Sequence, residues 1–261
     1  MDSANQGTPG VRISACMVLY HSGDQAVQAI RCLQESDVEV VTYVVDNSPR
    51  EDTAKRLLWM CPGIEYIPME RNVGFGRANN QVLRRLDSDY HLLLNPDVTF
   101  PPDLLRRMVT YMEQNPGAAI LTPRVFNPDG TEQFLPKKQP TVRYLLSGLL
   151  NRIGLGRGLR AEYTMAYASP TVPVSVQFAT GCFLLIRTAV FKRLNGFDER
   201  FFLYQEDSDL SRRAMQEGEI IYHPEMVVTH AWARENTRSL KGIAHQIRSV
   251  FRFFGKWGWR L

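Results

Sequence analysis

The chain has 261 residues, which is enough for one large domain or two small ones. Apolar residues make up 44% and charged residues 22%, which is ordinary for a globular protein and excludes extended disorder, collagen and coiled coil as the main state. We expect neither a membrane span nor a secretory signal, because the longest uncharged stretch, 163–186, contains two prolines and the first ten residues lack basic and apolar regions.

Charge is unevenly distributed along the chain. Two segments, 137–160 and 236–261, contain twelve of the 31 basic residues and no acidic residue. The rest of the chain is acidic, with 19 basic residues against 27 acidic ones. We expect a basic loop over 137–160 and an anionic partner at both segments. Four scattered cysteines without a CxxC pair argue against a disulfide scaffold or a structural zinc site and favour a cytoplasmic location.

The first 120 residues alternate between runs typical of strands and patterns typical of helices. The predicted strands are 11–20, 38–46, 64–68, 90–95 and 118–123. The predicted helices are 24–36, 51–60, 76–86 and 101–115. This alternation predicts an α/β fold with a mainly parallel sheet covered by helices.

The second half of the chain is less regular. Strands are predicted within 174–187 and in the segments EIIYHP and MVVTH, and helices over 189–194 and 207–218. A further helix is predicted from residue 238. It has one apolar stripe formed by Ile243, Ile247, Val250, Phe251 and Phe254.

Polar residues follow several of the predicted strands. In an open parallel sheet, ligands bind at the carboxyl ends of the strands, and Tyr20, Asp46 and Asn95 occupy such ends. Asp46 is suited to accept a hydrogen bond from a base N–H, and Tyr20 to stack on a ring. The run from Asp46 to Ser48 is also typical of an Asx turn, so this motif leaves both interpretations open.

The segment ERNVGFGRANN, residues 70–80, precedes a predicted helix. Gly74 and Gly76 permit a close approach of the backbone to a ligand, and the following helix N-terminus suits an anion. The segment lacks the third glycine of a dinucleotide fingerprint and the GK[ST] of a P-loop. Glycine is equally typical of a plain strand-to-helix connection.

Two further positions suit a metal. Asp97 follows the buried strand LLLN, and one carboxylate facing a cleft fits Mg²⁺ bound together with phosphate oxygens. His230 ends the strand MVVTH, where a neutral imidazole can complete a metal site with Asp97 or hold a phosphate. The alternatives are that Asp97 caps the next helix and that His230 is structural.

Three acidic residues, Glu206, Asp207 and Asp209, crowd the start of a predicted helix after an aromatic run. Asp209 can pair with Arg212 or Arg213, three and four residues further along the helix. The adjacent Glu206 and Asp207 are not explained in this way. A carboxylate among aromatic residues and beside another carboxylate has reason for a raised pKa, which suits a general base.

The chain resembles glycosyltransferase family 2, and within it the bacterial rhamnosyltransferase-like branch. The matching blocks are VVDNS, NVGFGRANN, LLLNPDV, TPRVFNPDG, GCFLLIR and GFDERFFLYQEDSDLSRR, followed by a strand-end histidine. They occur in the order and at the spacing of the family over about residues 11 to 256. The resemblance implies a GT-A fold, which is a Rossmann-like mixed sheet flanked by helices, and a nucleotide-diphosphate sugar as donor.

The resemblance also implies roles on the donor side. Asp46 reads the pyrimidine base. Tyr20 and Asn95 are assigned to the same donor site from their positions at strand ends. Asn72, Gly74 and Asn79 form the donor-binding loop and helix.

On the reacting side, Asp97 stands where the DxD motif of the family ligates Mg²⁺ or Mn²⁺. His230 lies near the diphosphate or the metal. Asp207 is the general base, with Glu206 beside it. The chain departs from DxD because Asn95 replaces the first carboxylate, which leaves one carboxylate for the metal.

The implied function is inverting transfer of a sugar, L-rhamnose from dTDP-L-rhamnose, in the synthesis of a bacterial surface polysaccharide such as O-antigen or cell wall. The implied acceptor is a saccharide or a polyprenyl-diphosphate-linked sugar. The alternatives are a family 2 transferase that uses a UDP- or GDP-sugar and a non-catalytic nucleotide-sugar-binding protein. Nucleic acid is disfavoured, because the body is acidic and has no basic-aromatic sheet motif.

The resulting organisation has three parts. Residues 1–10 form a flexible N-terminus, and 11–236 form the catalytic domain, with a nucleotide-sugar half over 11–100 and an acceptor half over 101–236. Residues 237–261 form a basic amphipathic helix whose arginines and aromatic residues suit peripheral contact with the inner face of the plasma membrane. Alternatively, the apolar stripe packs on the body or on a partner subunit.

Overall fold

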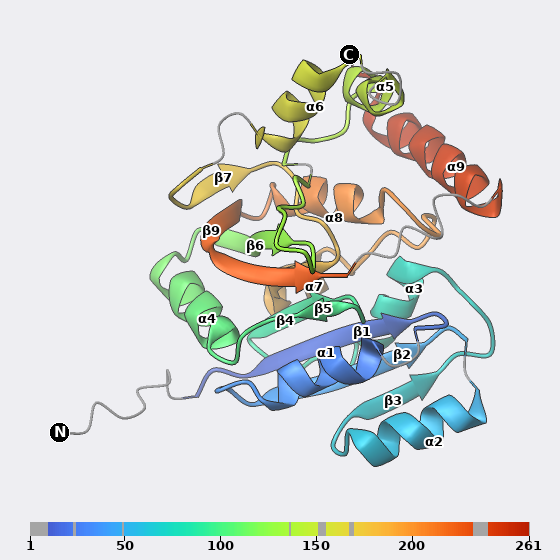
Figure 1. Cartoon of the computed structure of the whole chain (residues 1–261), viewed down its shortest axis with the longest axis vertical. Helices are drawn as coiled ribbons and strands as arrows, with labels where there is room; N and C mark the ends of the chain where they lie inside the picture. Colours follow the sequence, from blue (N-terminus) through green and yellow to red (C-terminus); the bar gives the residue numbers. More distant parts are fainter. Residues whose placement is uncertain are drawn as a thin grey trace.

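The structure is a computed structural model of the chain, and it describes residues 10–22, 25–48, 50–135, 137–150, 155–166, 170–231 and 240–260. The described strands form one sheet in the order β3-β2-β1-β4-β8-β6-β9-β5, with β7 beside β9 (Figure 1). The N-terminus that we expected to be flexible lies outside the described residues, apart from Gly10.

The first half of the sheet is parallel. β1 (Ile13–Leu19) lies between β2 (Val40–Asp46) and β4 (Tyr90–Leu94), and β3 (Glu65–Pro68) follows beyond β2. The connecting helices are α1 (Gln25–Gln34), α2 (Glu51–Met60) and α3 (Phe75–Asn79). The parallel arrangement predicted from the strand–helix alternation is confirmed.

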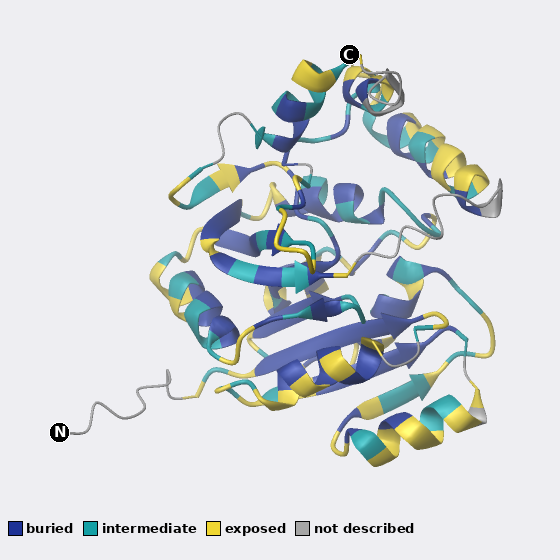
Figure 2. Cartoon of the chain, in the orientation of Figure 1, coloured by how far each residue is buried: buried dark blue, intermediate teal, exposed yellow. Residues whose placement is uncertain are grey.

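The central strands are buried on both faces, which explains their continuous apolar sequences. Leu92 and Leu94 of β4 belong to one cluster of buried side chains, and Leu93 belongs to a second cluster. Neighbouring side chains of a strand point to opposite faces, so the two clusters are the two layers of the core. β1 is buried along its whole length (Figure 2).

The second half of the sheet is mixed. β8 (Phe183–Arg187) runs antiparallel to both β4 and β6 (Ala118–Phe126), and β6 is parallel to β9 (Glu219–His230). β9 is one strand where the sequence suggests two, and it also pairs with β7 (Val174–Val176) and β5 (Val98–Thr99). The helices that pack on this half of the sheet include α4 (Leu104–Gln114), α7 (Thr188–Arg193) and α8 (Glu206–Ala214).

The helix predicted over 76–86 is shorter in the structure. α3 ends at Asn79, and a 3-10 turn, η1 (Asn80–Val82), follows it. The Asn80 side chain donates to the carbonyl of Phe197 and accepts from its N–H, both at 2.9 Å. These bonds to a distant segment occupy the residue at which the helix stops.

The basic loop predicted over 137–160 is wrong, because the described part of this segment contains helix α5 (Val142–Leu150) and the start of helix α6 (Arg157–Thr164). Glu162, just beyond the segment, forms ion pairs with Lys138 at 3.1 Å and with Arg143 at 3.0 Å. Lys137 is buried. The predicted positive charge is therefore partly neutralised within the fold.

Helix α9 (Leu240–Trp257) lies beside α5 at one end of the molecule (Figure 1). Phe253 and Phe254 of α9 form a small core with Phe201, against which Val142 and Leu145 of α5 pack. None of the helices in the described part of the chain has the length and apolarity needed to cross a membrane.

Candidate active site

The carboxyl ends of the parallel strands meet at one edge of the sheet. In the strand register, Leu19 lies opposite Asp46, and Met17 lies opposite Leu94. Tyr20, the residues after Asp46 and the residues after Leu94 therefore share this edge. The sequence-predicted strand-end residues Tyr20, Asp46 and Asn95 are brought to the same side of the molecule.

Asp46 is buried, with 1% of its surface exposed. Its Oδ1 accepts a hydrogen bond from the N–H of Ser48 at 2.8 Å, and its Oδ2 accepts one from the hydroxyl of Tyr66 at 2.7 Å. The hydroxyl of Ser48 also donates to Oδ1, at 3.3 Å. The Asx turn and the ligand role considered for this residue are compatible, because Oδ2 has a further lone pair. Tyr20 is 47% exposed and lies free of the core, with its ring against His21.

The segment from Asn72 to Gly76 lies against the segment that precedes α8. The Asn72 side chain accepts from the N–H of Gly74 at 2.9 Å, and Gly74 has a φ of 89°. A Cβ at Gly74 would lie 2.3 Å from the main-chain oxygen of Phe202. The close approach that we expected toward a ligand is therefore made to the chain's own backbone, and only glycine allows it.

Two buried asparagines form hydrogen bonds with the main chain of this loop and of α3. Asn47, directly after β2, is buried, and its amide donates to the carbonyl of Gly74 at 3.3 Å. Asn79 is also buried and donates to the carbonyl of Phe75 within α3 at 3.0 Å. Asn79 belongs to the expected loop and helix, but its side chain supports the helix rather than an open surface.

Asp97 and His230 come together although 133 positions separate them in the sequence. β5 pairs with the end of β9 and places Val98 opposite His230. The Nε2 atom of His230 lies 3.2 Å from Oδ1 of Asp97. On the other side of the ring, Nδ1 lies 3.2 Å from Oε1 of Gln133, whose amide N–H₂ donates to the His230 carbonyl at 2.7 Å.

The orientation of Gln133 determines the form of the neutral imidazole. Its amide nitrogen donates to carbonyl oxygens, so its Oε1 faces His230 as an acceptor and Nδ1 carries the proton. The lone pair of Nε2 then points toward Asp97. Two electron-rich atoms facing each other at this distance suit a shared cation.

Glu206 and Asp207 begin α8, where the helix N-terminus favours negative charge. Burial and the neighbouring Asp207 raise the pKa of Glu206 well above its ordinary value. Burial also raises the pKa of Asp207, to about 6, against the opposing effect of hydrogen bonds from the N–H groups of Gly181 and Ser208. Asp207 therefore changes charge near neutral pH, which suits proton transfer.

The two parts of the site face the start of β8. Burial raises the pKa of the Cys182 thiol to about 12, and both Asp97 and Asp207 add to this shift, so both carboxylates lie within electrostatic reach of Cys182. Asn95 donates its N–H to the Cys182 carbonyl at 2.9 Å, and Gly181 donates to Asp207 at 3.3 Å. The Asp97–His230 pair and the Asp207 carboxylate thus flank one short segment.

Residues 14–194 match the model of the family described as "Glycosyl transferase family 2", a range that includes every strand of the sheet except β9. The chain belongs to glycosyl transferase family 2. The matched region ends before α8, so Asp207 and His230 are placed at the site by the geometry alone.

Two bacterial rhamnosyltransferases are similar to this chain over much of its length. The N-acetylglucosaminyl-diphospho-decaprenol L-rhamnosyltransferase of Mycobacterium tuberculosis is 27% identical over 214 residues, which is 76% of this chain and 69% of the relative. The rhamnosyltransferase WbbL of Escherichia coli K12 is 27% identical over 252 residues, 92% of each chain.

Solved structures confirm the GT-A fold. The mannosyltransferase PcManGT of Pyrobaculum calidifontis, in complex with GDP-Man and Mn²⁺, has a TM-score of 0.63 at 15% identity, over 97% of this chain and 67% of that chain. S. aureus TarS has a TM-score of 0.57 at 16% identity over 86% of this chain, which spans only 37% of the length of TarS.

The Asp97–His230 pair fits a divalent cation only in part. Within the described residues, no group of three or more His, Cys, Asp and Glu side chains is arranged to hold a metal. Two ligands of one octahedral ion at about 2.1 Å lie about 3.0 Å apart, close to the observed separation. The pair therefore suits Mg²⁺ or Mn²⁺ whose remaining ligands are phosphate oxygens and water.

Sequence reasoning missed Gln133, Tyr66 and Asn47, which orient His230, Asp46 and the Gly74 loop. Tyr66 had a usable signal, because it lies in a predicted strand that ends beside the Asp46 edge. Gln133 had none, since it lies in an irregular segment far from His230 in sequence. It also lines a small pocket with Thr180, Lys137, Glu132 and Tyr222, among others.

Proposed function

We propose that the protein is an inverting glycosyltransferase that moves L-rhamnose from dTDP-L-rhamnose to a saccharide acceptor. The observation that carries the proposal is the division of the site into two parts. Asp207 is a carboxylate with a pKa of about 6, and the Asp97–His230 pair is suited to a cation. A single displacement needs these two groups on either side of the reacting carbon.

Asp207 acts on the acceptor. It takes the proton of the attacking hydroxyl while the oxygen forms a bond to the anomeric carbon, so a deprotonated carboxylate is required. Backbone N–H groups of Gly181 and Ser208 hold its two oxygens in place and leave each a lone pair for the hydroxyl. The bond from the anomeric carbon to the diphosphate breaks at the same time, and the configuration inverts.

Asp97 and His230 act on the leaving group. They would hold a divalent cation, which would supply positive charge to neutralise the departing nucleoside diphosphate. Gln133 fixes the ring of His230 with Nε2 toward Asp97, and the N–H of Ala231 donates to the Asp97 carbonyl at 2.9 Å. The two side chains are thus held in position before the donor binds.

The choice of donor and acceptor rests on the relatives. Two rhamnosyltransferases are similar to this chain over most of its length, and the name of one includes a diphospho-decaprenol acceptor. We therefore propose a saccharide or polyprenyl-diphosphate-linked acceptor and a role in bacterial surface polysaccharide synthesis. A lipid-linked acceptor would place the protein at the inner face of the plasma membrane.

The first test is ligand-dependent thermal stability. The purified protein is melted with dTDP, UDP or GDP, each with Mg²⁺, with Mn²⁺ or with EDTA. We expect dTDP with a metal to raise Tm most, because a ligand at about 100 times its Kd stabilises the folded state by about 2.7 kcal/mol.

Each outcome has a definite meaning. A selective response to UDP or GDP would replace the proposed donor, and the corresponding sugar nucleotides would be tested next for transfer. A folded protein that responds to no nucleotide, with or without metal, would contradict the proposed activity.

A further inference from the structure

The turn that precedes the catalytic carboxylates has an unfavourable backbone. Tyr204 and Gln205, directly before Glu206, have φ values of 69° and 66°. Such angles are uncommon for residues with a side chain, and they persist only where the surrounding structure fixes them. The direction of the Asp207 side chain therefore depends on contacts that hold this turn.

Helix α9 supplies contacts on the N-terminal side of the turn. The hydroxyl of Ser249 donates to the carbonyl of Leu203 at 2.8 Å. The ring of His245 stacks on Phe202 at 4.5 Å between centroids. Phe253 and Phe254 bury Phe201. The three residues before the strained pair are thus each in contact with α9.

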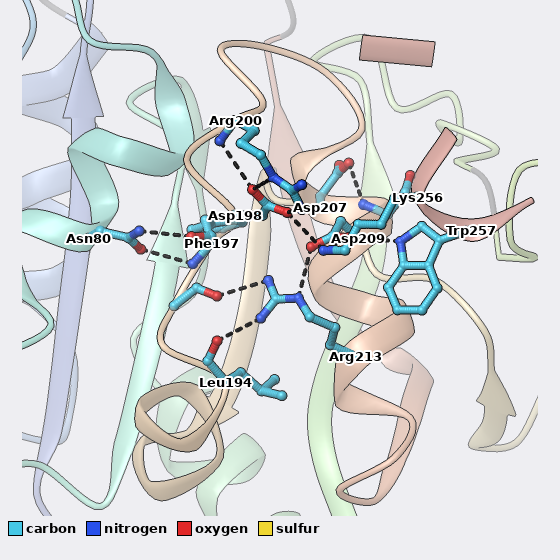
Figure 3. A network of polar contacts seen from close by, with 12 residues as sticks. Asn80, Leu194, Phe197, Asp198, Arg200, Asp207, Asp209, Arg213, Lys256 and Trp257 are labelled. Atoms are coloured by element: carbon cyan, nitrogen blue, oxygen red, sulfur yellow. Dashed lines mark hydrogen bonds and ion pairs between the residues drawn. The ribbon is translucent and has the colours of Figure 1, made fainter. Parts of the chain in front are cut away.

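The same helix supplies contacts beyond the turn, on α8 (Figure 3). Asp209 is fully buried, and its Oδ1 accepts from Lys256 at 2.6 Å and from the indole N–H of Trp257 at 2.8 Å. Its Oδ2 accepts from Arg213 of α8 at 2.8 Å. Lys256 also pairs with Asp198 at 2.8 Å, so one ammonium group joins the segment before the turn to the helix after it.

The segment before the strained turn also contacts the loop around Gly74 and the start of α3. The carbonyl of Phe202 accepts from the N–H of Phe75 at 3.0 Å. Asn80 fixes the main chain of Phe197 from the opposite side (Figure 3). The main chain at Phe197 and Phe202 is therefore held by bonds outside α9, so a loosened turn moves Asp207 and leaves the Gly74 loop in place.

From these contacts we propose that α9 is a positioning element of the active site, with Ser249 and Trp257 as positioning residues for Asp207. The inference rests on the proposed function, because it assigns Asp207 as the base. α9 makes bonds to both sides of the strained turn, and Ser249 and Trp257 bond to Leu203 and Asp209 rather than to Glu206 or Asp207. Its role is to fix the direction in which α8 presents them.

The test uses two mild substitutions in the full chain. Trp257→Phe removes the N–H that bonds Asp209 and keeps a ring over Arg212. Ser249→Ala removes the bond to Leu203. Gln246→Ala, at an exposed position of the same helix, is the matched control. Folding is checked for each variant by circular dichroism and by Tm.

We expect both variants to lower kcat by about 10- to 100-fold with an unchanged KM for the donor, because a small displacement of a reacting group costs this much. We also expect the acid limb of the pH profile to move to lower pH as Asp207 becomes more exposed to water. The groups that face Asp207, namely Glu206, Tyr163 and Cys182, stay unchanged in these variants.

A loss of activity that only follows the unfolded fraction, with the wild-type pH profile, would overturn the proposal. So would wild-type kcat in both folded variants. A second readout does not depend on transfer. The pKa of the Asp207 carboxyl, followed by NMR in protein labelled with ¹³C at aspartate, should fall in Trp257→Phe and stay constant in Gln246→Ala. If the wild type transfers no sugar, this measurement alone decides the positioning role.

Discussion

Glu206 and Asp207 are neighbours in sequence, yet their surroundings separate their chemistry. Asp207 accepts hydrogen bonds from two backbone N–H groups, which favour its charged form and limit the effect of burial. Glu206 is buried, and its Oε2 has no hydrogen-bond partner within the described residues. Burial and the charge of Asp207 both raise the pKa of Glu206, so a charged Asp207 favours the neutral form of Glu206.

This difference predicts distinct results for two conservative substitutions. Asp207→Asn should lower kcat by about 10²–10⁴-fold and leave nucleotide binding intact, because only the proton acceptor is lost. Glu206→Gln should keep most activity, since glutamine resembles the neutral acid. In the wild type, kcat/KM should rise with pH through about 6, where Asp207 ionises. Steady-state kinetics over this pH range measures all three effects.

Stability provides the control for this prediction. An acid whose pKa is raised by folding binds protons more tightly in the folded state, so stability increases as pH falls through about 6 toward the unfolded pKa. Asp207→Asn should therefore raise Tm relative to the wild type at pH 8, and less so at pH 5. If Glu206→Gln loses as much activity as Asp207→Asn, the assignment of the base is wrong.

Asp97 and His230 give a prediction about metal. Asp97→Asn keeps the shape of the side chain but removes the charge that faces Nε2 of His230. We expect kcat to fall by about 10²-fold or more and the Mn²⁺-dependent part of the Tm increase with nucleotide to disappear. Asp87→Asn, with its carboxylate exposed on the surface, is the matched control. A metal response that survives Asp97→Asn would assign the cation to other ligands.

At the scale of elements, α9 has two apolar faces where the sequence suggested one stripe. Phe254 of that stripe is buried and Val250 packs beside it. This part of the stripe therefore packs on the body of the protein, which was the alternative to membrane contact. Ile243, Ile247 and Phe251 are 41%, 53% and 61% exposed. The exposed side of α9 is visible in Figure 2. A helix that is apolar on both sides can be held by the body and still present an apolar surface.

The exposed face predicts contact with an anionic membrane. Arg248 and Arg260 are exposed in the same region as the apolar side chains, and each basic residue near such a surface contributes about 1 kcal/mol. The full chain should float with vesicles that contain phosphatidylglycerol and should stay behind with phosphatidylcholine alone. Ile247→Ser combined with Phe251→Ser should abolish flotation and leave Tm unchanged, since neither side chain is buried. Undiminished flotation of this variant would contradict the membrane contact.

The segment 137–160 shows why composition misleads at this scale. Its lack of acidic residues suggested a basic loop. Glu162, however, lies in α6 one helical turn beyond Gly158, and it forms ion pairs with Lys138 and Arg143. Lys137 is buried against Tyr222, and burial lowers its pKa to about 8. The local composition gives the number of charged residues in a segment, but the fold determines which of them form ion pairs.

At the scale of the whole molecule, the mixed sheet assembles the site from distant segments. The insertion of β8 between β4 and β6 brings Gly181 and Cys182 to the end of β4, beside Asn95 and Asp97. The pairing of β9 with β5 brings His230 to the same place. The sequence order of these segments, in contrast, places α4, α5 and α6 between them. Only the strand order of the sheet explains their proximity.

The sequence by itself determined the parallel half of the sheet and the positions of the strand-end residues. These depend on short apolar runs, turn residues and helix patterns, which are local properties of the chain. The Asp46 edge and the acidic start of α8 were therefore predictable, and so was the resemblance to the family.

The tertiary structure alone decided the partners of these residues. The orientation of His230 by Gln133, the contact of Gly74 with Phe202 and the bonds of α9 to Asp209 join residues that are distant in the chain. The pKa of Asp207 likewise depends on burial and on the backbone N–H of Gly181, which lies two residues before β8. Such properties arise from packing and from the exclusion of water, which no local sequence pattern specifies.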